Sequence, residues 1–571
     1  MTQPRKKAMS VADFIADRLV RAGVRHVFGV GGANIEDIFA AVQRRRPDIR
    51  AVLGKHEHAS GSAADAYARL TGGLGVVLAT SGGGAMNLVH AVAEARASRV
   101  PLLAIVGEPP TEVQGLGAFQ DTSGRNGAVD AAAVFKAVSV WCARVERVAD
   151  VPQLISDALD VALGDPFGPA VLLLAKDRQS AQLSTESSDD WRPAPRLAPV
   201  PDAVLVQRAT TLLHASPVLV IAGDEVVRSG AQGELAVVAD ALDAQVAVTP
   251  DARDAFDNDS PRFIGVSGAM GTPDVARALA GAGACLLVGT RLPLLARQGL
   301  EPLLSDKSIV SLGRERPFVT SPDGVHLEGD LLGCLRALHA EWGGVDPIVH
   351  EKRPPATSVP TRVDADALNA RTALALVERA LPERGVVIVD AGNTGATSVH
   401  HLRAPRGVRW LLAMGMAGMG YSFGAAVGAA FATGRRCVVL AGDGAFFMNG
   451  LDIHTAVEHE LPITYVIFND RAHGMCLVRE RLFLHENAGY NAFRSSHIGA
   501  GLAAMFPRLA ACDCRTPASL EQALDRAAHA KGPSVISVEL DDVEIPPFAA
   551  FQKAAVEGVF TVSRGGADEG D

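Results

Sequence analysis

The chain of 571 residues is long enough for three or four domains of about 150 residues each. It is 48% hydrophobic and 21% charged, which excludes a disordered chain, and its 57 glycines and 32 prolines follow no period, which excludes a collagen-like protein. A net charge of −10 and only 5% aromatic residues argue against a nucleic-acid-binding surface. Seven cysteines without paired spacing exclude a disulfide scaffold and favour the cytoplasm.

The first segment with a clear pattern, VADFIADRLVRAG at 11–23, predicts an amphipathic helix. Asp13 and Asp17 interrupt it, so it lacks the apolar core of a signal peptide. The longest apolar runs, such as AVLLLA after Pro169, are strand-length and too short to span a bilayer. We therefore expect a cytoplasmic protein that binds neither a membrane nor nucleic acid.

Two segments rich in Ser, Pro and charged residues, 180–202 and 343–366, are predicted to be linkers. They divide the chain into domains at 1–185, 200–342 and 365–545, followed by a C-terminal segment at 546–571. The final residues, GGADEGD, are expected to be disordered.

Within each domain, short apolar runs rich in Val, Ile and Leu alternate with helical patterns. The predicted strands are 75–80, 101–106, 218–223, 284–289, 436–441 and 463–468, and the clearest predicted helices are 86–97 and about 446–459. Continuous apolar strands joined by helices indicate parallel sheets covered on both faces, so we predict three doubly wound α/β domains, the outer two of shared architecture. Ligands of such domains bind at the carboxyl ends of the strands.

One loop at a strand end reads Gly442-Asp443-Gly444-Ala445, and Asp470 follows the next strand. Two carboxylates at one sheet edge suit a hard divalent cation, and glycines there let backbone N–H groups face a phosphate. The residues alone also allow a simple turn with Asp470 as a helix cap.

A second loop reads Lys55-His56-Glu57-His58 and precedes ASGSAADAYARLTG. Small residues after Glu57 predict a helix that packs closely on a neighbour, so the carboxylate is expected to be poorly solvated and its pKa raised. A solvated glutamate at a helix start remains the alternative. A zinc site is not expected, because HExxH requires a histidine where Ser60 stands.

Three further segments have ordinary explanations of their own. The run MGMAGMGYSFGAAVGAA after Ala413 permits close backbone approach, and its methionines could be core residues. Gln120 in GAFQD could be a surface glutamine, and Asp390-AGNTG follows a predicted strand.

Together, GDG with Asn469-Asp470, KHEHASGSAADAYARLTG and the run after Ala413 resemble the thiamine diphosphate (ThDP)-dependent enzymes, in particular the acetolactate synthase-like branch. FGVGGAN at 28–34 and ATSGGGAMN at 79–87 are weaker matches. The resemblance implies pyrimidine-binding, central and diphosphate-binding domains in chain order.

The resemblance also implies residue roles. Glu57 would hydrogen-bond N1′ of the aminopyrimidine, with Gln120 beside the reacting carbon, and Mg²⁺ would be bound by Asp443, Asp470 and the carbonyl of Ala472. The family usually has Asn at position 470. The implied cofactor-binding residues are Glu57, Asn393, Thr394, Ala417 (through its carbonyl), Met419 (under the cofactor), Gly442, Asp443, Gly444, Ala445, Asp470, Ala472, Gly474 and Met475.

The implied activity is carboligation: a 2-keto acid donor is decarboxylated to an enamine, which adds to an unidentified carbonyl acceptor. The family's acceptor-site arginine and tryptophan are replaced here by Leu295 and Arg479. Arg479 could contact an anion or only solvent. The alternatives are a 2-keto acid decarboxylase and an acyloin lyase/ligase similar to benzaldehyde lyase, with Gln120 and His58 handling protons. Pyruvate decarboxylases, which belong to the same family, typically carry a His-His pair near the position of Gln120. This chain has none, which favours ligation or cleavage of C–C bonds over simple decarboxylation.

Other classes are less well supported. No G-x-G-x-x-G motif appears, which argues against a nicotinamide dehydrogenase, and Glu57 with the metal motif argues against a catalytically inactive relative. FAD is possible, since GVSGAMGTPDVARAL at 265–279 resembles a flavin-binding loop of the branch, but IVSLGRERP does not match the segment expected next. The resemblance implies a homodimer or homotetramer with the cofactor at the subunit interface.

Overall fold

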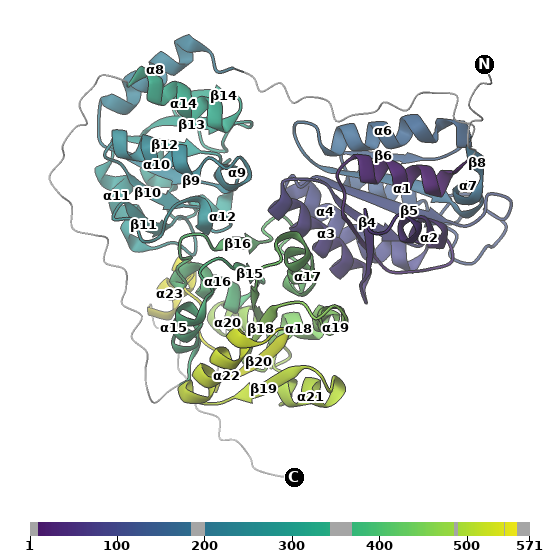
Figure 1. Cartoon of the computed structure of the whole chain (residues 1–571). Coiled ribbons are helices and arrows are strands. Elements are labelled where there is room, and N and C mark those ends of the chain that lie inside the picture. The colour runs from purple at the N-terminus through teal and green to yellow at the C-terminus, as the bar shows by residue number, and fades with distance from the viewer. Residues whose placement is uncertain (1–8, 184–199, 343–367, 485–488, 542, 557–571) are drawn as a thin grey trace.

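A computed structural model describes residues 9–183, 200–342, 368–484, 489–541 and 543–556. It contains three six-stranded parallel sheets, each covered by helices, and these form the three lobes of Figure 1. Three α/β domains were predicted, and this fold class is confirmed. No helix among the described residues is long and apolar enough to cross a membrane.

The N-terminal domain has the strand order β3-β2-β4-β5-β7-β6. Its main strands are β2 (His26–Gly29), β3 (Arg50–Leu53), β4 (Gly75–Ala79), β5 (Leu102–Glu108), β6 (Trp141–Arg144) and β7 (Pro169–Ala175), and β1 (Met9–Ser10) pairs antiparallel with β8 (Gln182–Leu183). Its helices are α1 (Val11–Arg21), α2 (Glu36–Arg44), α3 (Glu57–Thr71), α4 (Gly83–Ala97), α5 (Ala131–Val138), α6 (Val151–Ala162) and α7 (Lys176–Ser180).

The central domain has the strand order β11-β10-β9-β12-β13-β14. Its strands are β9 (Val218–Ala222), β10 (Gln245–Val248), β11 (Phe263–Val266), β12 (Ala284–Val288), β13 (Ser308–Gly313) and β14 (Val325–Glu328). Its helices are α8 (Ala203–His214), α9 (Asp224–Arg228), α10 (Gln232–Ala241), α11 (Pro273–Gly281), α12 (Leu294–Arg297), α13 (Glu301–Leu304) and α14 (Leu331–Glu341).

The C-terminal domain has the strand order β16-β15-β17-β18-β20-β19. Its strands are β15 (Val386–Val389), β16 (Arg409–Leu412), β17 (Cys437–Gly442), β18 (Ile463–Asn469), β19 (Ala510–Cys514) and β20 (Ser534–Glu539). Its helices are α15 (Ala370–Ala380), α16 (Asn393–His401), α17 (Tyr421–Thr433), α18 (Asp443–Asn449), α19 (Ile453–Glu458), α20 (Gly474–Arg479), α21 (Ile498–Met505), α22 (Pro517–His529) and α23 (Ala549–Val556), with a π-helix η4 at Glu480–Leu484.

The predicted elements form for simple local reasons. Strand β7, PAVLLLA, is buried along its whole length, as expected for the interior of a sheet covered on both faces. Helix α1 begins where the Ser10 hydroxyl accepts the Asp13 N–H. The predicted helix at about 446–459 starts earlier, at Asp443, and a 3₁₀ turn at Gly450–Asp452 divides it into α18 and α19.

Counted along the chain, the outer sheets share the order 2-1-3-4-6-5, which confirms the common architecture, and the central sheet has the order 3-2-1-4-5-6. In each outer domain the strand order therefore reverses between the first and third strands, where ligands of such sheets bind. The domain boundaries stay predictions, because most of both predicted linkers and the whole GGADEGD tail lie outside the described residues.

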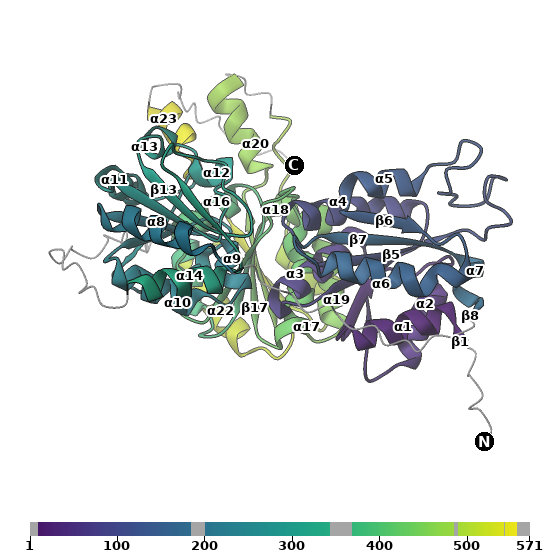
Figure 2. The ribbon, with the colours of Figure 1, turned by 90° about the horizontal axis from the view of Figure 1, so that it is seen from above.

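Helices α3 and α17 join the two outer domains, and they lie side by side in Figures 1 and 2. Their backbones approach closely: a methyl group at Gly424 would meet the carbonyl of Ala59, and one at Gly428 that of Ala63. The small-residue runs on both helices thus serve a contact between domains.

Replacing Gly428 by alanine is expected to destabilise the protein by about 1–3 kcal/mol, because the added methyl group forces two packed backbones apart. The matched control is Gly501→Ala in α21, where the new methyl group meets open space and higher helix propensity predicts stabilisation by about 0.5–1 kcal/mol. Denaturant unfolding of both variants checks this. An equally stable Gly428→Ala protein would contradict the packing.

Candidate functional site

The C-terminal switch point lies between β15 and β17, which pair side by side. After β15 the chain forms the turn before α16, whose first residues are Asn393 and Thr394, and after β17 it begins α18 at Asp443. Asp390, at the end of β15, accepts the N–H groups of Gly420 and Ser422, each at 2.9 Å. These bonds attach the loop before α17, including Met419, to the same edge.

Asp443 and Asp470 lie in contact at this edge and are both mostly buried. Burial raises the pKa of Asp443 to about 6, although the N–H of Gly444, at 2.9 Å, opposes the shift. Burial and the neighbouring charge of Asp443 raise the pKa of Asp470 to about 8. Two carboxylates so placed repel each other unless a proton or a cation lies between them.

The residues present fit a magnesium ion. One oxygen of Asp443 and the side-chain oxygen of Asn393 are buried without a hydrogen-bond partner, and Asn393 and Asp470 both border Gly474 at the start of α20. Oxygen ligands suit a hard cation. No group of three or more His, Cys, Asp or Glu side chains in the described parts of the chain could hold a metal, so a metal here needs oxygen ligands besides the two carboxylates.

The other predicted residues of this domain gather around the same loop. Met419 and His473 border Gly444, Ala472 is buried, and Met475 lies in α20. His473 was missed by the sequence reasoning. The Nδ1 atom of its ring is buried without a partner, and its place between Ala472 and Gly474 was the available signal.

The N-terminal switch point lies between β2 and β4. Glu57 is the first residue of α3 and is 8% exposed, so the predicted burial is confirmed. Asn87 of α4 donates to its carboxylate at 3.0 Å, and a methyl group at Gly84 would lie 2.9 Å from the other carboxylate oxygen. Asn87 stood in the matched segment ATSGGGAMN, but no role was predicted for it.

Gln120 packs over the same turn. Its backbone has the left-handed φ of 58°, and its side chain covers Gly82, whereas Glu57 borders Gly84. The structure therefore brings Gln120 and Glu57 to one turn.

His58, which follows Glu57 in α3, contacts Asn449 of the C-terminal domain. Its ring stacks on His90 with centroids 4.5 Å apart, and its Nδ1 lies 3.2 Å from the side-chain nitrogen of Asn449. Burial, then the charges of His90 and His56, lower the pKa of His58 to about 4. His58 is consequently neutral at neutral pH, and His90 was not predicted.

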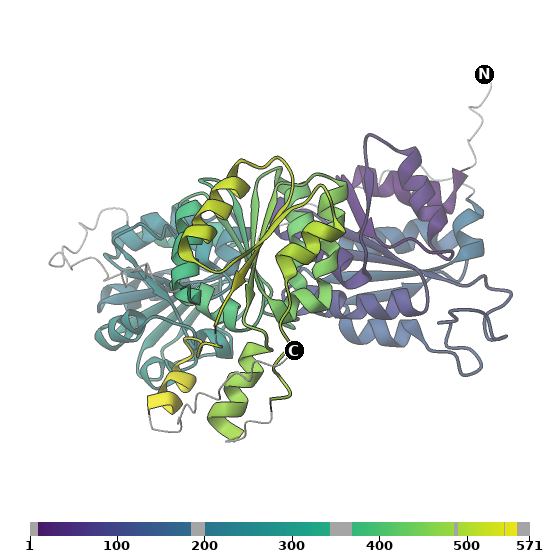
Figure 3. The same cartoon turned by 90° about the horizontal axis from the view of Figure 1, so that it is seen from below.

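Leu295 and Arg479 stand at the positions of the family's acceptor-site arginine and tryptophan. Arg479 is exposed, with its guanidinium 5.8 Å from the centre of the Phe483 ring. Leu295 is half-buried, and Arg297 donates to the carbonyl of Leu292 at 3.0 Å. Figure 3 shows α23 and α20 on the same side of the C-terminal sheet, where Phe551 of α23 packs into the cluster around α20 and η4.

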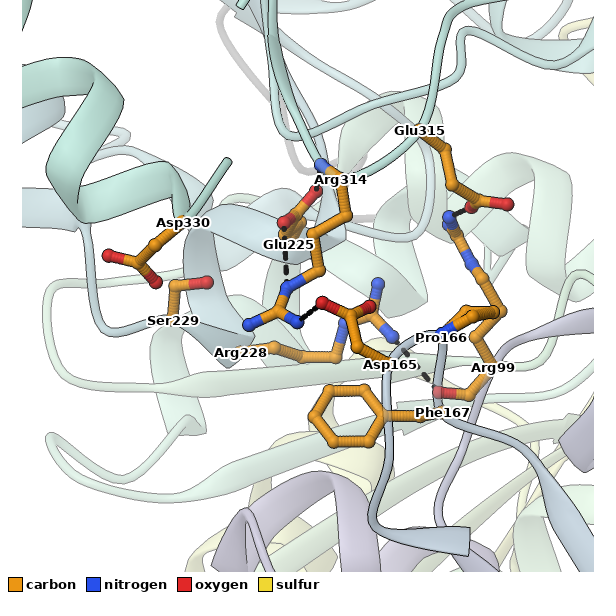
Figure 4. Close-up of a pocket in the computed structure, with 10 residues that line it drawn as sticks. All are labelled: Arg99, Asp165, Pro166, Phe167, Glu225, Arg228, Ser229, Arg314, Glu315 and Asp330. Atoms are coloured by element: carbon orange, nitrogen blue, oxygen red, sulfur yellow. Dashed lines mark hydrogen bonds and ion pairs between the residues drawn. The ribbon is translucent and has the colours of Figure 1, made fainter. Parts of the chain in front are cut away.

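Side chains of both charges gather at the switch point of the central domain. At its switch point Glu225 fills the space beside Gly313, and its carboxylate lies 3.6 Å from the guanidinium of Arg314. Arg314 also pairs with Asp165 of the N-terminal domain, as Arg99 does with Glu315 (Figure 4).

The cavity between these ion pairs measures about 240 Å³. Arg99, Arg228 and Arg314 line this cavity together with the acidic side chains. The glycines of 265–271 serve packing, since a methyl group at Gly268 would meet the carbonyl of Leu295. FAD stays an expectation from the resemblance alone.

The fold and these sites define a three-domain α/β protein with a buried acidic site at the switch point of each outer domain. Three family models match it in order: the N-terminal TPP binding domain of thiamine pyrophosphate enzymes at 9–128, their central domain at 206–338 and their C-terminal TPP binding domain at 390–538. The chain belongs to this family of thiamine diphosphate-dependent enzymes, which form or cleave C–C bonds, and is acetolactate synthase-like.

Similar proteins span nearly the whole chain. The large subunit of acetolactate synthase isozyme 1 from Escherichia coli K12 is 26% identical, covering 96% of this chain and 98% of that subunit. A probable acetolactate synthase large subunit from Methanocaldococcus jannaschii is 25% identical, covering 94% of this chain and 93% of that subunit. The solved structure of a Rhodococcus jostii RHA1 thiamine diphosphate-dependent 4-hydroxybenzoylformate decarboxylase superposes with a TM-score of 0.80 at 21% identity, covering 94% of this chain and 99% of that one. This last similarity shows the fold alone.

Proposed function

We propose that the protein is a ThDP- and Mg²⁺-dependent carboligase that takes a 2-keto acid donor and joins it, after loss of CO₂, to a carbonyl acceptor. The observation that carries this proposal is the pair of buried acidic sites at equivalent switch points of two domains that pack together through α3 and α17. The similarity to acetolactate synthases favours the 2-keto acid as donor. When bound, ThDP supplies a carbon nucleophile that adds to carbonyl groups.

The chain's own residues divide the work between the two domains. We propose that Asp443, Asp470 and the carbonyl of Ala472 hold Mg²⁺. The buried oxygens of Asp443 and Asn393 that lack a hydrogen-bond partner support this proposal. Loop backbone at Gly442, Gly444, Ala445 and Gly474, with the side chain of Thr394, would face the diphosphate, and Met419 and Met475 would supply apolar contacts.

In the N-terminal domain, we propose that Glu57 holds a proton at N1′ of the aminopyrimidine. Its burial supports this role, because a cofactor ring that contacts Glu57 there is shielded from water. Asn87 fixes its orientation through the 3.0 Å hydrogen bond. Gln120, over the same turn, is proposed to contact the reacting groups.

A 2-keto acid decarboxylase and an acyloin lyase/ligase are the alternatives. The stacked pair of His58 and His90 favours the second, because a neutral imidazole at the junction of the outer domains can accept a proton from a substrate hydroxyl.

Product analysis tests the proposal. The protein is incubated with ThDP, Mg²⁺ and a panel of 2-keto acids, with and without aldehyde acceptors, and products are identified by mass spectrometry. We expect a coupled hydroxyketone product that requires both cofactors. CO₂ with free aldehyde as the only products would favour the decarboxylase, and cleavage of an added acyloin the lyase.

We propose a homodimer or homotetramer with the cofactor at the subunit interface, in a cytoplasmic setting that the seven free thiols support. The structure describes a single chain, in which α3 packs on α17. A cofactor site shared between two subunits therefore stays a prediction. Light scattering of the cofactor-loaded protein is expected to give at least a dimer. An active monomer would contradict this prediction.

A further inference from the structure

Glu94 of α4 reaches across the junction between the outer domains. Its carboxylate accepts the backbone N–H groups of Gly415 at 3.1 Å, Met416 at 2.5 Å and Ala417 at 3.2 Å. Glu94 is 3% exposed. A buried carboxylate of the N-terminal domain thus holds three consecutive amides of the C-terminal domain.

The segment that Glu94 holds has an unusual backbone. Ala417 has a φ of 52°, in the left-handed region that favours glycine and costs other residues about 1 kcal/mol or more. A methyl group at Gly415 would lie 3.0 Å from a Glu94 oxygen. The conformation therefore requires an external partner, and Glu94 supplies it.

The surroundings keep Glu94 charged and fixed. Burial by itself raises the pKa of Glu94, but the Arg69 guanidinium, the Ser98 hydroxyl and the backbone N–H groups together lower it below its usual value. Ser98 donates to the carboxylate at 2.6 Å and Arg69 lies 3.5 Å away. Arg69 is itself paired with Asp65, which accepts the Tyr421 hydroxyl at 2.6 Å.

A reciprocal contact exists on the other side of the junction. Asp452 of the C-terminal domain accepts the N–H of Lys55, at 3.2 Å, in the loop before Glu57. Each outer domain thus uses a buried carboxylate to hold the loop that precedes the other domain's interface helix.

We propose that Glu94 is a positioning residue for the cofactor: it holds the backbone of 415–417 in the conformation that presents the Ala417 carbonyl to the aminopyrimidine. The inference rests on the proposed function and adds a residue that acts only through the loop. The negative charge is essential, because an amide offers one oxygen to three N–H groups and turns its own N–H groups toward at least one of them.

The test compares Glu94→Gln with Glu458→Gln. Glu458 is also a carboxylate at this junction, paired with Lys55 at 2.6 Å, but it does not contact residues 415–417. Hydrogen–deuterium exchange mass spectrometry of the cofactor-free proteins follows the amides of 413–420. Exchange of the C2 proton of bound ThDP in D₂O follows cofactor activation without any substrate.

In Glu94→Gln we expect faster amide exchange confined to 415–417 and C2 exchange slowed by at least about tenfold, with Glu458→Gln like the wild type in both. Unchanged amide exchange, a loss of protection throughout α3 and α17, or normal C2 exchange would overturn the proposal. If Glu94→Gln does not fold, Glu94→Asp, which keeps the charge opposite Arg69 but withdraws it by one methylene, is judged by the same criteria. A wild-type protein without ThDP binding would contradict the proposed function, and the amide exchange would still decide whether Glu94 holds the loop.

Discussion

Replacing Glu57 by glutamine is expected to lower ThDP-dependent turnover by about 10²–10⁴-fold, the usual contribution of a positioned acid or base. The side chain keeps its size and its oxygen for the Asn87 hydrogen bond at 3.0 Å, so the fold is expected to remain intact. What is lost is a group that can hold a proton at N1′. Turnover and C2–H/D exchange of bound ThDP are expected to fall in parallel, while the affinity for ThDP and Mg²⁺ stays close to that of the wild type.

The control for this variant is Glu112→Gln, the same change at an exposed turn of the same domain. It is expected to behave as the wild type in both assays. Undiminished turnover in Glu57→Gln would refute the role of Glu57, and loss of cofactor binding would show that its role is structural.

Replacing Asp443 by asparagine is expected to weaken Mg²⁺-dependent ThDP binding by at least about 100-fold, more than the loss of a residue behind a metal ligand usually costs. The metal-free protein is expected to be no less stable, because the change removes one of two buried carboxylates in contact, whose pKa values are raised to about 6 and about 8. Calorimetric titration measures the first effect and thermal unfolding of the metal-free protein the second.

Asp470→Asn is the matched comparison, since it makes the same change of charge in the adjacent side chain. The family usually has asparagine at this position, so this variant is expected to keep metal and cofactor binding. Equal loss in both variants would mean that charge alone controls the site, and unchanged binding in Asp443→Asn would exclude Asp443 as a ligand.

The sequence allowed the sheets and the two loops to be predicted because both depend on local patterns. Buried strands such as β17 and β18 are continuous apolar runs, and the residues after them necessarily meet at one sheet edge. The burial of Glu57 could also be predicted from a local pattern, because the residues that follow it in α3 are small and allow close packing.

Contacts between domains could not be predicted. Glu94 and Gly415 are 321 positions apart, and α4 shows no pattern that separates Glu94 from a solvated glutamate. The role of the glycines at 265–279 could not be predicted for a related reason: glycines that admit a phosphate and glycines that admit a neighbouring carbonyl, as Gly268 does, look alike in sequence. The sequence likewise left open whether Arg479 contacts an anion or only solvent, and the structure shows that its side chain is exposed.

The central claim, carboligation by a ThDP- and Mg²⁺-dependent enzyme, is tested most directly by the stoichiometry of one reaction. With the best 2-keto acid and acceptor from the panel, CO₂ released and coupled product formed are measured in the same tube. The account predicts equal amounts of the two, and neither without ThDP or Mg²⁺. Release of CO₂ with only free aldehyde beside it, at saturating acceptor, would contradict it.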